Sequence, residues 1–263
     1  MLSALFGLLQ AAAIFAAYLL SGKIPLGIIK SSSVRELVGR LLPFVCVLIL
    51  TLIFSLVNRK KFSARLLGRP ARSLAAGAAV GAAMVLAVAA VLWLAKSASF
   101  DAAGKSEGIG SVCLAALAQA CTHTLISLGF IYELLRYRVG SPAAWLYSVV
   151  CFTLLELLGT QPNAMNVIAV ASVALALCAV RELTESVVAP AAAYSVWLIA
   201  VGPVLGIAMP GADYGRLIGS KLSGPAILTG GSFGVNASAV TVSAALIAAA
   251  ACAGAAAVRH SKE

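Results

Sequence analysis

The stretch LAAGAAVGAAMVLAVAAVLWL, residues 74–94, holds 21 consecutive residues without a charged side chain. A helix rises about 1.5 Å per residue and the hydrocarbon core of a bilayer is about 30 Å thick, so this segment is long enough to cross a membrane. The whole chain of 263 residues has the same character, because 62% of it is apolar, 11% is charged and its mean hydropathy is +1.03. Soluble domains average about 45–50% apolar and about 25% charged residues. The composition therefore excludes a soluble globular enzyme.

Eight apolar segments predict an all-α, polytopic (multi-pass) integral membrane protein built as a helical bundle. They are residues 2–20, 41–57, 74–94, 109–132, 143–158, 167–180, 186–205 and 240–258. The sixth is the shortest, and residues 164–166 could extend it. We expect one transmembrane domain, 1–263, with three parts: N-terminal helices (1–108), a core with a glycine-rich external connection (109–239), and a last helix with a basic tail (240–263).

The net charge of +10 comes from Lys and Arg that lie between the apolar segments. This pattern is typical of topology signals, and no nucleic-acid partner is expected. Residues 58–73 contain six positive charges and no acidic residue, which predicts a cytoplasmic loop. With that loop in the cytoplasm, both termini are predicted to be cytoplasmic as well. We expect the protein to lie in the cell membrane. The same segment could also bind anionic lipid, although topology alone accounts for its charge.

Small residues predict close helix packing in two places. Gly77 and Gly81 have GxxxG spacing, and the last apolar segment is nearly all Ala. We favour packing within the chain over dimerisation, because a bundle of eight helices needs several close contacts. The glycine-rich connection, 209–239, could be a lid over a site or a set of turns along the membrane surface.

Two ionisable residues, His123 and Glu156, lie inside apolar segments. A charge at membrane depth costs about 2.5–3.5 kcal/mol on insertion scales, so each needs a partner. Both are equally far along the chain from the short turn around Val139 and Gly140, and an antiparallel hairpin would bring them to the same depth. We expect the imidazole to donate a hydrogen bond to the carboxylate.

Two roles for this pair stay open. It could handle protons or activate water, or it could be a polar contact that fixes helix register. Tyr194 could add a hydroxyl group to this polar site, or it could only fill space in the core. The predicted binding residues are His123, Glu156 and Tyr194. A zinc site needs three or four ligands, and with one internal histidine we expect no metal and no cofactor. The six cysteines are scattered through apolar stretches, which indicates buried free thiols.

The order of several motifs between residues 122 and about 238 resembles the CPBP family of intramembrane proteases, which includes the CAAX prenyl endopeptidases and bacteriocin-processing or immunity proteins. In that family, the helix that carries the EExxxR motif ends in a basic stretch followed by a turn. Here residues 136–140, RYRVG, are similar to that stretch and turn. The family's FxxxH is similar to 152–156, FTLLE, and its Ser-Pro approach to HxxxN is similar to 186–198, SVVAPAAAYSVWL. The segment 228–234, LTGGSFG, resembles a glycine-rich stretch seen after the catalytic helices of some members.

The residues at the family's catalytic positions are replaced. Counted back from the turn, the two glutamates fall on His123 and Thr124, and the arginine falls on Leu128. The two histidines fall on Glu156 and Tyr194, and the asparagine falls on Leu198. The resemblance implies that the first glutamate and the histidines would activate a water and that the asparagine would stabilise the oxyanion. Leucine can do neither, so we expect no catalytic residue among these degenerate positions.

Three functions remain after this comparison. The leading hypothesis is a catalytically inactive, CPBP-like pseudoenzyme that acts by binding, as a scaffold, a complex subunit or an immunity-type partner. Its partners would be the lipid bilayer together with another membrane protein or a hydrophobic or lipidated peptide. The second is an active intramembrane endopeptidase that uses Glu156 and His123 in exchanged roles. The third is a proton-coupled small-molecule transporter that uses the same pair as a relay.

Overall fold

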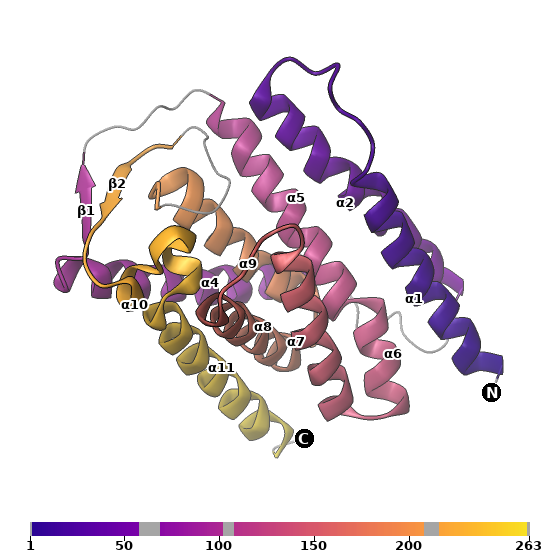
Figure 1. Ribbon diagram of the computed structural model, residues 1–263. Helices are drawn as coiled ribbons and strands as arrows, with labels where there is room; N and C mark the ends of the chain where they lie inside the picture. Colours follow the sequence, from indigo (N-terminus) through magenta and orange to yellow (C-terminus); the bar gives the residue numbers. More distant parts are fainter. Residues whose placement is uncertain (1, 58–68, 102–107, 208–215, 262–263) are drawn as a thin grey trace.

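The computed structural model describes residues 2–57, 69–101, 108–207 and 216–261 (Figure 1). Its α-helices are α1 (Leu2–Ser21), α2 (Ser32–Val57), α4 (Pro70–Leu94), α5 (Ile109–Leu128), α6 (Phe130–Arg138), α7 (Ser141–Leu157), α8 (Ala164–Thr184), α9 (Val188–Ile199), α10 (Ala226–Thr229) and α11 (Ala239–His260). A π-helical turn, η1 (Ala200–Val204), extends α9, and a 3-10 segment, η2 (Gly231–Ala237), precedes α11. Two short strands are β1 (Ala98–Asp101) and β2 (Gly219–Leu222).

The membrane-spanning character of the helices agrees with the sequence. Within the described ranges, five helical segments are long and apolar enough to cross a bilayer, and three shorter apolar helices accompany them. All eight predicted segments are therefore helical, and the protein is a polytopic membrane helical bundle. The sixth segment begins at Ala164, so residues 164–166 do extend it, with the Asn163 side chain accepting a hydrogen bond from the Asn166 backbone N–H as the N-cap.

The predicted fourth segment, 109–132, lies within one of the five candidate spans, but its helix is not continuous. It is divided into α5 and α6 at Gly129, whose ψ of −123° is far from helical. A Cβ at this position would overlap the Leu125 carbonyl oxygen, so a glycine is required where the chain changes direction. α6 then packs against α7, and the arm that carries His123 is a bent pair of helices.

Helices α4 and α9 make the close contact that the GxxxG spacing predicts. A Cβ on Gly77 would overlap the carbonyl oxygen of Ala189, and one on Gly81 would overlap that of Ala193. Packing within the chain is therefore confirmed for this pair of glycines. The alanine-rich α11 packs against α8, where Ala245 is fully buried.

The strands form a small antiparallel ribbon that the sequence analysis did not predict. Ala98 pairs with Leu222 and Asp101 pairs with Gly219. Four-residue strands in connections between helices show too little alternation to be recognised in sequence. Figure 1 shows this ribbon at the opposite side of the molecule from the paired helices α1 and α2.

The core that positions the site is built around α5 and α8. α5 packs against α2, α7 and α9, and α8 packs against α7 and α11. All six cysteines are free, and Cys151, Cys178 and Cys252 are buried. Two sequence features lie partly outside the described residues: 58–68 of the basic segment and 208–215 of the glycine-rich connection.

Candidate functional site

The centre of the site is the contact between His123 of α5 and Glu156 of α7. The His123 Nδ1 atom lies 2.8 Å from Glu156 Oε2. His123 is buried, and the Glu156 side chain is 14% exposed. An ionised carboxylate only accepts hydrogen bonds, so Nδ1–H donates. The contact expected from the sequence is present, even though α5 and α6 are not one straight arm.

The remaining polar atoms of the pair also have protein partners. The Tyr18 hydroxyl of α1 lies 3.3 Å from His123 Nε2, which accepts from it in the neutral imidazole. Gln119 Nε2 donates to Glu156 Oε1 at 3.4 Å, one turn before His123 on α5. Tyr194 of α9 lines the same small cavity as Glu156. Three helices, α1, α5 and α7, are thus joined by hydrogen bonds through two ionisable side chains.

Aromatic rings fix the orientation of these groups. The Phe152 ring packs edge-on against Tyr194 with ring centroids 4.9 Å apart, and against His123 at 6.3 Å. Phe152 lies one turn before Glu156 on α7, so the ring and the carboxylate share one helix face. Such edge-to-face contacts hold both neighbouring rings in place.

The degenerate motif positions do not all reach the site. The structure brings His123, Glu156 and Tyr194 together, as the sequence predicts. The Thr124 hydroxyl instead donates to the Ala120 carbonyl of its own helix at 2.7 Å. Leu198 is buried in the apolar core.

Asn236 is a residue at the site that the sequence analysis missed. It belongs to η2 and lines a cavity of about 20 Å³ together with Glu156, Tyr194 and Thr241. Its side-chain oxygen accepts from Trp197 Nε1 at 3.3 Å, and its backbone carbonyl accepts from Asn166 Nδ2 at 3.1 Å. The cavity has room for about one water molecule. The sequence signal that could have indicated Asn236 is its position as a polar residue within the glycine-rich connection.

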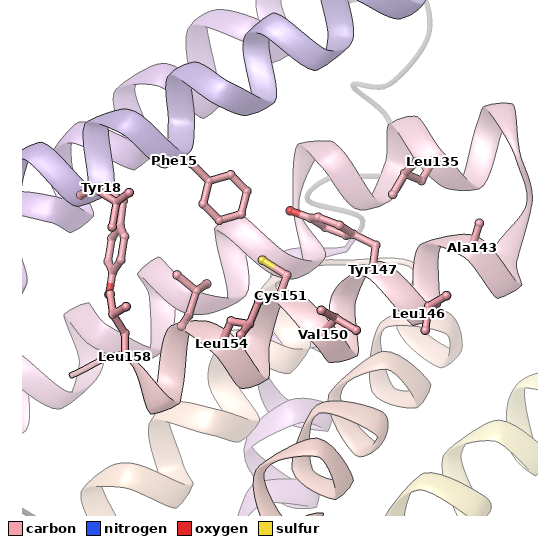
Figure 2. A pocket seen from close by; sticks show the side chains of 12 residues that line it. Phe15, Tyr18, Leu135, Ala143, Leu146, Tyr147, Val150, Cys151, Leu154 and Leu158 are labelled. Atoms are coloured by element: carbon pink, nitrogen blue, oxygen red, sulfur yellow. The ribbon is translucent and has the colours of Figure 1, made fainter. Parts of the chain in front are cut away.

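Two larger cavities meet at Tyr18. The first, about 340 Å³, is lined by His123, Gln119, Lys23 and Arg40 among others and is called the cationic pocket below. The second, about 650 Å³, is called the apolar groove. It runs along α7 beneath Phe15 and Tyr18, as Figure 2 shows, with Leu135 at its far end. His123 therefore lines the cationic pocket, whereas Glu156 lines the small cavity beside Asn236.

A second polar cluster, also missed, lies where α6, α7 and α8 meet. Arg181 is fully buried and forms an ion pair with Glu133, and its Nε donates to the Leu128 carbonyl at 3.3 Å. Beside it, Glu182 accepts from Tyr132, from Trp145 Nε1 at 3.3 Å and from Arg136 at 2.9 Å. Arg181 therefore does not contribute a surface charge near the end of α8. The sequence signal for this cluster was the pair of adjacent charged residues, Arg181 and Glu182, near the end of an apolar helix. Each of them forms an ion pair with a residue of α6.

The comparison with protein families agrees with the order of motifs. Residues 105–200 match the Rce1-like family, described as type II CAAX prenyl endopeptidase Rce1-like. This Rce1-like segment covers about a third of the chain and includes all six degenerate motif positions. The resemblance to the CPBP family is confirmed over this segment. Searches of curated proteins and of solved structures gave no match.

The Rce1-like segment supplies α5 to α9, and therefore His123, Glu156 and Tyr194. Tyr18, Lys23, Arg40 and Asn236 come from outside it. Among the described residues, no group of three or more His, Cys, Asp or Glu side chains could hold a metal ion. The described site therefore offers one imidazole (His123), one carboxylate (Glu156), two phenols (Tyr18 and Tyr194), two amides (Gln119 and Asn236), and the cations of Lys23 and Arg40.

Proposed function

We propose that this protein is a catalytically inactive, CPBP-like membrane protein that acts by binding another membrane protein or a hydrophobic or lipidated peptide. The observation that carries the proposal is the hydrogen bond between His123 and Glu156, together with the contacts of Tyr18 and Gln119 to the other polar atoms of both groups. A general base must present a free lone pair to water or substrate. Here His123 Nε2 and both Glu156 oxygens already accept hydrogen bonds that join helices of the bundle.

The surroundings of Leu198 support the same proposal. The resemblance assigns the oxyanion-stabilising asparagine to this position, and a buried leucine provides no donor. The cavity beside Glu156 has a volume of about 20 Å³, which admits one water molecule but no peptide group. Binding without cleavage needs neither the donor nor the space.

One observation favours the second candidate, an active endopeptidase with exchanged roles. Asn236 brings an amide to the same small cavity as Glu156, so a donor from η2 could replace the one lost at Leu198. In that mechanism Glu156 would accept a proton from the water in the cavity, and Asn236 would donate to the oxyanion.

A cleavage and binding assay separates the two candidates. Purified protein is incubated with a fluorescent prenylated peptide and with a fluorescent transmembrane peptide, and both cleavage and anisotropy are measured. We expect binding of at least one peptide and no product from either. Product formation by the wild type that Glu156→Gln and Asn236→Ala both abolish would overturn the proposal and establish the enzyme.

We also propose that residues 1–263 form a single transmembrane domain in the cell membrane with both termini cytoplasmic. In Figure 1 the marked termini and the α6–α7 turn lie at the same, lower end of the molecule. That turn carries Arg138, and positive charges favour the cytoplasmic side. Reporter fusions at each terminus, active on one side of the membrane only, test this orientation.

A further inference from the structure

We infer that the cationic pocket and the apolar groove together form a binding site for one anionic phospholipid, whose headgroup lies on Lys23 and Arg40 and one of whose acyl chains lies along α7. This inference goes beyond the proposed function and does not depend on it. It rests on three features: the shared lining of the two cavities, the charge at one end, and the lack of free polar groups in the groove.

The two cavities adjoin each other. Tyr18, Leu19 and Leu158 line both of them, so a single elongated molecule that passes these side chains would occupy both. The volumes of about 340 and 650 Å³ are in the usual range for ligand sites, about 300–1,000 Å³. Figure 2 shows the side chains of α7, including Leu146, Val150 and Leu154, forming one wall of the groove opposite Phe15.

The charged end lies at headgroup depth. Lys23 follows the end of α1 at Ser21, and Arg40 directly precedes the apolar run of α2 that ends at Val57. That run of 17 residues is about 25 Å long, close to the thickness of the hydrocarbon core. Both cations therefore lie at one membrane interface, where phosphate groups are found.

Lys23 and Arg40 can attract an anion because, within the described ranges, no acidic side chain forms an ion pair with them. This holds although Glu36 is one turn from Arg40 on α2. The nearest deep carboxylate, Glu156, is held by His123. Two cations in a pocket between helices can hold the phosphate of a lipid headgroup by charge-assisted hydrogen bonds. With a cytoplasmic N-terminus the pocket lies at the external interface, so the lipid would come from the external leaflet.

The groove suits a hydrocarbon chain better than an extended peptide. Two tyrosine hydroxyls reach its lining, and both are engaged: Tyr147 donates to the Ile126 carbonyl at 3.0 Å, and Tyr18 contacts His123. An extended peptide would leave its backbone N–H and C=O groups without partners in an apolar site, at a cost of several kcal/mol for each group. An acyl chain has no polar group to satisfy.

The test measures lipid retention by native mass spectrometry. Purified protein is delipidated and offered phosphatidylglycerol, phosphatidylcholine with the same acyl chains, or a hydrophobic peptide with a free carboxylate. We expect one phosphatidylglycerol to be retained above the other two probes. The double variant Lys23→Gln/Arg40→Gln should weaken this retention about tenfold or more. Its matched control, Lys30→Gln/Lys221→Gln, removes the same charge from two exposed lysines outside both cavities and should not.

A second pair of variants tests the groove independently of charge. Val150→Trp should fill it and weaken phosphatidylglycerol retention, whereas Ile247→Trp on the exposed face of α11 should not. Equal retention of the two lipids, preferential retention of the peptide, or equal effects of a variant and its control would each overturn the inference. Thermal unfolding of every variant shows that it is folded. If the protein cleaves peptides and still retains phosphatidylglycerol, the proposed function fails while this inference stands.

Discussion

Glu133 of α6 forms an ion pair with Arg181 of α8, and the arginine side chain is fully buried. The Arg181 guanidinium also lies 5.5 Å from the centre of the Tyr132 ring and donates to the carbonyl of Leu128, the last residue of α5. One side chain thus connects α8 to both helices that flank the bend at Gly129. The bend and the ion pair are parts of the same structural unit.

Removing one member of this ion pair should be strongly destabilising. Arg181→Met leaves the Glu133 carboxylate buried without its cation, and we expect a loss of about 3–5 kcal/mol in the free energy of unfolding. Unfolding in detergent, followed by circular dichroism, measures it. The control is Arg72→Met on exposed surface of α4, which should change stability little. The double variant Glu133→Leu/Arg181→Met should recover part of the loss, and a double variant less stable than Arg181→Met would contradict this account.

The contact between His123 and Glu156 should appear as a coupling free energy. We expect His123→Leu and Glu156→Leu each to destabilise, and the double variant to lose less than the sum, with a coupling of about 1–2 kcal/mol. The reason is that either single variant leaves a polar group in the membrane without its partner. Equilibrium unfolding of the four proteins gives the value. Strict additivity would mean that the hydrogen bond contributes nothing to stability.

The glycines of α4 should not tolerate larger side chains. Gly77→Val places side-chain atoms on the backbone of Ala189, and overpacking of this kind costs about 1–3 kcal/mol or prevents folding. Gly254→Val on α11 is the matched control, because a Cβ there meets no atom within 4 Å. Thermal stability and the yield of monodisperse protein are the measurements. Similar behaviour of the two variants would show that α4 and α9 are not in close contact.

Cys151 should react with maleimides faster than Cys178. Cys151 lines the apolar groove, whereas Cys178 is fully buried among the helices. We expect a membrane-permeant maleimide to modify Cys151 several times faster, measured by mass spectrometry of peptides from folded protein. In denatured protein the two thiols should react alike. Preferential modification of Cys178 would place the groove elsewhere.

The sequence predicted the membrane helices well because their signal is local. An uninterrupted apolar run such as 74–94 needs no knowledge of the rest of the chain. The contact of His123 with Glu156 was also predictable, since equal distances from one turn give equal depth in a helical hairpin. The bend at Gly129 does not change this result, because His123 lies on α5 before the bend and still reaches α7.

The missed features depend on tertiary structure. Asn236 reaches the site through η2, a segment without helical period, so its sequence position gives no indication of its neighbours. An arginine near a helix end usually lies at the surface, so the position of Arg181 in the sequence does not indicate its burial. Its burial depends on Glu133, which lies on another helix.

The β1–β2 ribbon has a consequence for how the protein is assembled. β1 follows α4, and its partner β2 emerges only after α5 to α9 have been made. During synthesis the edge of β1 therefore has no strand to pair with until five further helices have entered the bilayer, and contacts so distant in sequence form late. Pairing of β1 with β2 therefore joins the connection that follows α4 to the connection that follows α9, across all the helices made between them.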